Sequence, residues 1–119
     1  MLFLKKTTDP VAPGVYAVDV AAKPPGNTFM IYAAVDTTLP TAFIEAVEGM
    51  GFKQISAKSY KHHNGKEIVD LQFQKGGTDI FEGWTAAEKA ANLEMIEKVF
   101  SGLNIPVTPR VMSLAEAFR

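Results

Sequence analysis

Two alternating segments joined by Asn64-Gly65 constrain the fold of this chain more than any other feature. Asn and Gly tolerate the positive φ angles of tight turns, so this dipeptide between alternating apolar and polar residues predicts a β-hairpin. We expect the hairpin to span residues 52–74. Because side chains alternate between the two faces of a strand, the length of the loop decides which side chains face the core.

Two loop lengths give opposite orientations for the first arm of the hairpin. A two-residue loop pairs Lys58 with Leu71 and places an ammonium group on an apolar face, which is costly if that face is buried. A three-residue loop, His63-Asn64-Gly65 with Gly65 left-handed in a bulge, pairs Lys58 with Asp70. We favour the second register because opposite charges then lie across from each other. It also pairs Gln54 with Gln74, Ile55 with Phe73, Ser56 with Gln72, Ala57 with Leu71, Ser59 with Val69 and Tyr60 with Ile68.

Two further strands are expected before the hairpin. Residues 15–22 and 28–36 alternate in the same way and are separated by a loop rich in proline. In the first of them, alternation places Tyr16, Val18 and Val20 on one face. The two strands would themselves form an antiparallel pair.

Two amphipathic helices are predicted on either side of the hairpin. Apolar residues at helical spacing indicate one helix between Pro40 and Gly51 and a second between Thr85 and Gly102. A short strand within 107–112 and a final helical turn would follow. The expected inner stripe of the second helix is Ala86, Ala90, Leu93, Ile96 and Phe100.

The order of these elements is typical of a single α+β domain covering residues 1–119. It runs β-β-α-β-β-α, followed by the short strand and helical turn. A mostly antiparallel sheet gives the two helices one apolar surface, so both should pack on the same face. We therefore expect a ferredoxin-like fold or a related split α/β sandwich.

The composition of the chain excludes several classes of function. Twelve basic and thirteen acidic residues give a net charge of −1, so no global field attracts nucleic acid or an anionic membrane. The absence of cysteine excludes disulfides and thiolate chemistry. No apolar run approaches membrane-spanning length, and we expect a soluble cytoplasmic protein.

The residue types that carry catalysis are not arranged for it in the sequence. His62 and His63 are the only histidines, and neighbouring residues of a strand point to opposite faces, so they do not readily share a metal. Gly76-Gly77 lacks the lysine and glycine spacing of a phosphate loop. We therefore predict no catalytic residues, no metal site, no cofactor and no enzymatic activity.

The sheet face opposite the helices is the predicted binding surface. It mixes apolar and polar side chains, which makes it too apolar for idle exposure and too polar for a core. We predict a small regulatory module that binds another protein, or a second copy of itself as a homodimer, through this open face and the hairpin. The predicted binding residues are Met30, Tyr32, Lys58, Tyr60, Ile68, Asp70 and Trp84.

Single-stranded nucleic acid is an alternative partner for the same face. Tyr32 and Tyr60 would stack on bases while Lys58 and Lys61 contact phosphates. Glu67 and other acids interleave with these lysines, and lysine on an edge strand also guards against aggregation between sheets. Protein binding is therefore the favoured hypothesis.

A third hypothesis concerns the residues just before the second helix. Trp84 lies directly before the Thr85 cap, close to Asp79 and Glu82. A small molecule or a substrate could be held there, but tryptophan packed over the first helical turn is the simpler interpretation.

Overall fold

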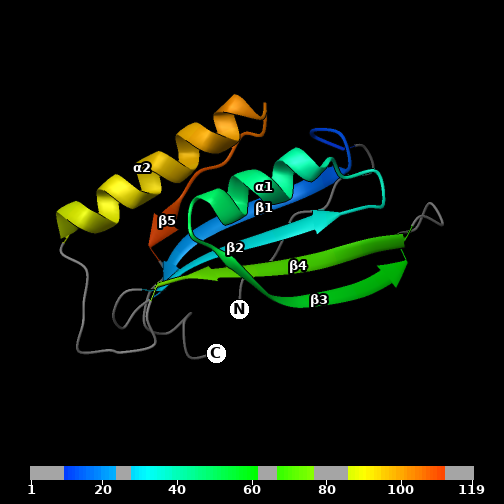
Figure 1. Cartoon of the computed structure of the whole chain (residues 1–119), viewed down its shortest axis with the longest axis horizontal. Coiled ribbons are helices and arrows are strands. Elements are labelled where there is room, and N and C mark those ends of the chain that lie inside the picture. Colours follow the sequence, from blue (N-terminus) through cyan, green and yellow to red (C-terminus); the bar gives the residue numbers. More distant parts are fainter. Residues whose placement is uncertain (1–9, 24–27, 62–66, 77–85, 112–119) are drawn as a thin grey trace.

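The predicted order of strands and helices is confirmed in a computed structural model, which describes residues 10–23, 28–61, 67–76 and 86–111 (Figure 1). The predicted hairpin loop and final helical turn lie outside these ranges. The elements are β1 (Val15–Lys23), β2 (Thr28–Val35), α1 (Thr41–Gly49), β3 (Lys53–Lys61), β4 (Glu67–Lys75), α2 (Ala86–Gly102) and β5 (Arg110–Val111).

The strands form one sheet in the order β3-β4-β2-β1-β5. The strands β1 to β4 pair in antiparallel fashion, and the short β5 is parallel to β1. The α+β class and the antiparallel sheet are thus confirmed. The ferredoxin-like strand order is not, because β1 lies between β2 and β5 and adds a strand to the β-α-β-β-α-β pattern of that fold.

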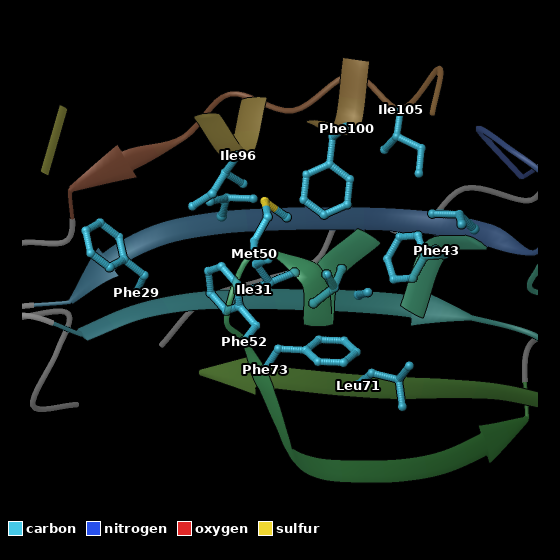
Figure 2. Packing of buried hydrophobic residues seen from close by; sticks show 14 of the residues in the cluster. Phe29, Ile31, Phe43, Met50, Phe52, Leu71, Phe73, Ile96, Phe100 and Ile105 are labelled. Carbon is cyan, nitrogen blue, oxygen red and sulfur yellow. The ribbon is translucent and has the colours of Figure 1, made fainter. Parts of the chain in front are cut away.

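The main core lies between the helices and one face of the sheet. Phe43 from α1 and Phe100 from α2 are buried in the same apolar cluster as Ile31 and Phe73 of the sheet. Figure 2 shows side chains from both layers meeting in this space. The rings of Phe43 and Phe100 pack with centroids 5.7 Å apart. Burial of each such side chain stabilises the fold by about 1.5–3 kcal/mol.

The helix α2 is turned slightly from the predicted orientation. Ile96 and Phe100 are fully buried as expected, but Ala90 is exposed. A polar contact joins the helix to the sheet, in which Lys75 Nζ of β4 donates to Asn92 Oδ1 at 3.1 Å. The ammonium group also lies 6.0 Å from the ring centroid of Phe52. Asn92 therefore lies on a side of the helix that contacts the sheet.

The predicted hairpin register is confirmed from Ser56 to Tyr60, where Lys58 lies opposite Asp70. It is wrong before Ser56. A bulge between Gln54 and Ser56 shifts the pairing, so Gln54 and not Ile55 lies opposite Phe73. Ile55 is 52% exposed. Among the described strands, β3 pairs with β4 alone, so an extra residue is accommodated there without disturbing a second described neighbour.

The predicted orientation of Tyr16 is wrong because β1 contains a second bulge. The pairing of β1 with β2 shifts between Val15 and Ala17, which removes Tyr16 from the face of Val18 and Val20. Tyr16 is 2% exposed and packs with Ala34 and Ile68 in a separate cluster on the opposite face. Its phenol is hydrogen-bonded in this position, because Tyr16 Oη donates to Asp36 Oδ2 at 2.7 Å.

Asp36 connects the end of β2 with the chain entering β1 and α1. Its backbone N–H donates to the carbonyl of Gly14 at 2.9 Å. Its Oδ1 atom accepts hydrogen bonds from the backbone N–H of Thr38 at 2.8 Å and from the Thr38 hydroxyl. The carboxylate therefore fixes the turn from the sheet into α1.

We expect Tyr16→Phe to lower the free energy of unfolding by about 1–3 kcal/mol, because it removes a hydrogen bond to a carboxylate and leaves the ring in place. Urea denaturation followed by circular dichroism measures the change. Ser59→Ala removes an exposed hydroxyl from β3 and should alter stability by less than about 0.5 kcal/mol. Equal stability of Tyr16→Phe and the unchanged protein would contradict this account of the turn.

Candidate interaction surface

The sheet face opposite α1 and α2, called here the helix-free face, carries most of the predicted binding residues. The strand register places Met30, Tyr32, Lys58, Ile68 and Asp70 on it. Met30 and Ile68 are buried, Tyr32 and Asp70 are half-buried, and Lys58 is exposed. The accessible part of this face is therefore more polar than its residue types alone indicate.

The remaining predicted residues are less fully placed. The backbone of Tyr60 lies opposite Ile68, as expected, and Lys61 lies opposite Glu67. Trp84, Asp79 and Glu82 lie outside the described residues, as do His62 and His63. The hypothesis of a site near Trp84 thus stays a prediction.

A row of polar side chains crosses the helix-free face at right angles to the strands. Ser56 on β3 lies opposite Gln72 on β4, Gln72 lies opposite Tyr32 on β2, and Tyr32 lies opposite Asp19 on β1. All four are half-buried. This polar row brings a hydroxyl, an amide, a phenol and a carboxylate into one line.

The residues beside the polar row are small or apolar near the centre of the sheet. Ala34 and Met30 lie on either side of Tyr32 along β2, and Ala21 lies opposite Met30. All three are buried. The polar row is thus where hydrogen-bonding side chains gather on the described central strands of this face.

The charges of the helix-free face are balanced. Among its described side chains, Lys53 and Lys58 on β3 are offset by Asp19 on β1 and Asp70 on β4. A single-stranded nucleic-acid platform depends on an excess of basic side chains that follow the phosphates. The described side chains of this face show no such excess.

The outer strand β3, called here the β3 edge, has exposed side chains on both faces of the sheet. Ala57 and Ser59 point to the helix side and Lys58 to the helix-free side, and all three are exposed. Figure 1 shows β3 at the far side of the sheet from α2. In the described part of the chain, β3 has a strand neighbour on one side only, which is β4.

Two of the hollows lined by described residues lie beside α1 and α2. An apolar cavity of about 60 Å³ lies between Val15, Phe43 and Ile105, which is well below the size of small-molecule pockets. A wider hollow of about 440 Å³ beside the end of α2 is open, and Glu97 is the one ionisable side chain among its lining residues. Across ranges 10–23, 28–61, 67–76 and 86–111, no group of three or more His, Cys, Asp or Glu residues could hold a metal ion.

The two described helices are too short or too polar to cross a membrane. Comparisons of the chain with protein family models, curated proteins and solved structures gave no match. Evidence for the function therefore comes from the residues and geometry of this chain alone.

Proposed function

We propose that the protein is a small non-enzymatic binding module that contacts another protein, or a second copy of itself, through the helix-free face and the β3–β4 hairpin. A regulatory role in the cytoplasm belongs to the same proposal. The observation that carries it is the polar row of Ser56, Gln72, Tyr32 and Asp19 across four neighbouring strands.

The chemistry of the polar row suits a protein partner. Its four side chains include both donors and acceptors, as the polar groups of protein interfaces do. Tyr32 lies in the middle of the row, between Gln72 and Asp19. Tyrosine at the centre of an interface commonly carries a large share of the binding energy.

We also propose that the domain is a ferredoxin-like sandwich with one additional strand. Support comes from the connection β2-α1-β3, in which β4 lies between two parallel strands, as in a split β-α-β unit. On this interpretation β1 is inserted between β2 and β5, and the sheet is widened on that side.

The proposal is tested by substituting the polar row and measuring association. Tyr32→Ala and Gln72→Ala are compared with Lys98→Ala on the exposed side of α2, where Lys98 Nζ lies 3.4 Å from Glu94 Oε1. Sedimentation velocity reports self-association, and chemical crosslinking with capture from a lysate of the source cells reports other partners. Circular dichroism checks that each variant is folded.

We expect Tyr32→Ala to weaken association about tenfold or more and Lys98→Ala to leave it unchanged. Association of Tyr32→Ala and Gln72→Ala at the level of the unchanged protein would reject the helix-free face as the binding surface. Filter binding of single-stranded DNA over a range of salt separates the nucleic-acid alternative. Salt-dependent retention that Tyr32→Ala abolishes would favour nucleic acid as the partner.

A further inference from the structure

We propose that the β3 edge binds an extended acidic segment of another protein, which adds to the sheet as a further strand. This inference rests on the proposed function and specifies the chemistry of the partner. Strand addition at a free sheet edge is a recurring mode of peptide recognition, in which main-chain hydrogen bonds give affinity and alternate side chains give specificity.

The β3 edge is accessible for such an addition. It is the last strand on its side of the sheet, and Gln54, Ile55, Ala57, Lys58 and Ser59 are all exposed. The other side of the sheet differs, because β1 is joined there by β5. Within the described ranges, the longest backbone edge without a neighbouring strand is therefore that of β3.

The charge of the β3 edge selects an acidic partner. Three lysines, Lys53, Lys58 and Lys61, lie within its nine residues, and the strand itself contains no aspartate or glutamate. The neighbouring strand β4 places Asp70 opposite Lys58 and Glu67 opposite Lys61. With Lys75 of β4 included, the two strands carry four basic and two acidic residues, so an excess of positive charge remains at this edge. This positive charge is local, since the whole chain has a net charge of −1. Pairing with the same strand of a second copy would bring these lysines close to one another, whereas an acidic strand is attracted by them.

The local geometry leaves a regular ladder and one apolar contact. The bulge is confined to the start of β3, and the register from Ser56 to Lys61 is uninterrupted. Ala57 and Ser59 are small, so the side chains of an incoming strand have room beside them. Ile55 is 52% exposed at the bulge and offers an apolar contact to the end of that strand.

Edge lysines and bulges also protect sheets against aggregation. The two roles are compatible in this strand. The lysines repel a basic edge brought into contact with β3, and burying them against a neutral edge costs desolvation energy, so an acidic segment is the favoured neighbour. A strand that only prevents aggregation should not prefer an acidic peptide, whereas a strand that recognises an acidic segment should bind it. This difference can be measured with peptides of opposite charge.

The test is fluorescence anisotropy with the full chain and a labelled peptide in which glutamate alternates with valine and threonine. One control peptide carries lysine in place of glutamate, and another carries a central proline, which removes a ladder donor. Lys58→Glu is the test variant. Lys98→Glu on α2 makes the same change in net charge away from the edge.

We expect the glutamate peptide to bind, the two control peptides to bind weakly or not at all, and Lys58→Glu to weaken binding about fivefold while Lys98→Glu leaves it unchanged. No binding of the glutamate peptide at low ionic strength would overturn the inference. Equal binding of the proline peptide, or equal losses in the two variants, would overturn it as well. If the peptide fails but Tyr32→Ala still abolishes association with a partner, strand addition is rejected and the proposed function stands.

Discussion

Gly14→Ala is expected to lower the free energy of unfolding by about 3 kcal/mol or more. Gly14 has a φ angle of +72°, a conformation that side chains other than glycine adopt at a cost. A Cβ atom at this position would lie 2.4 Å from the backbone nitrogen of Leu39 and 2.6 Å from its Cα atom. The backbone of Leu39 is held by a hydrogen bond from its N–H to the carbonyl of Asp36 at 3.2 Å, so it cannot move aside freely.

Gly49→Ala is the matched control for this substitution. Gly49 lies in α1, and a Cβ atom there would meet no heavy atom within 4 Å. Alanine should therefore be neutral or stabilise the helix by up to about 1 kcal/mol. Denaturant unfolding of both variants measures the contrast. A Gly14→Ala variant as stable as Gly49→Ala would show that Gly14 and Leu39 do not approach each other in this way.

Phe100→Ala is expected to cost about 3–5 kcal/mol, because it removes a large buried side chain and leaves a cavity between the helices and the sheet. Phe100 is 0% exposed and packs against the ring of Phe43. It comes from α2 and joins the same apolar cluster as Phe43 of α1 and Ile31 of the sheet (Figure 2). The substitution should therefore loosen both helices together.

Met95→Ala provides the comparison on the same helix. Met95 is 38% exposed on the outer side of α2, and its removal should cost less than about 1 kcal/mol. Thermal and denaturant unfolding of the two variants gives the difference. Similar losses at the two positions would contradict the orientation of α2. Phe100→Leu, which keeps most of the apolar volume, should recover part of the stability lost in Phe100→Ala.

The parts of the fold that depend on local pattern could be predicted from the sequence. The pairing of Lys58 with Asp70 follows from the alternation of the two arms and from the charges that then lie opposite each other. The two bulges could not be predicted in this way. Each inserts one residue where alternation continues without a break in the sequence, and Tyr16 is displaced toward an acceptor, Asp36, that is 20 residues away.

For the helix-free face, the sequence predicts which residues share the face but not which of them are buried. Alternation assigns Met30, Tyr32 and Ile68 to one face, but it does not tell which of them are covered, and Met30 and Ile68 are buried. The alignment of Asp19 with Tyr32 and Gln72 depends on the strand order. That order includes the pairing of β2 with β4, which are far apart in the sequence, so no single segment encodes it.

The exposure of Ala57 and Ser59 was missed for a related reason. Ala57 and Ser59 face the helix side of the sheet, where the sequence pattern predicts a covered core. In the structure they are exposed. The buried helix side chains reach the other strands instead, and this lateral placement of α1 and α2 is a tertiary property.

The most direct measurement of strand addition at the β3 edge is amide hydrogen exchange by nuclear magnetic resonance on the isotope-labelled full chain, with and without the glutamate–valine–threonine peptide. We expect outward-facing amides between Ser56 and Lys61 to exchange rapidly in the free protein and to become protected when the peptide is bound. Amides of α2 should keep their exchange rates. Protection confined to α2 or to β1, with unchanged exchange along β3, would contradict the account.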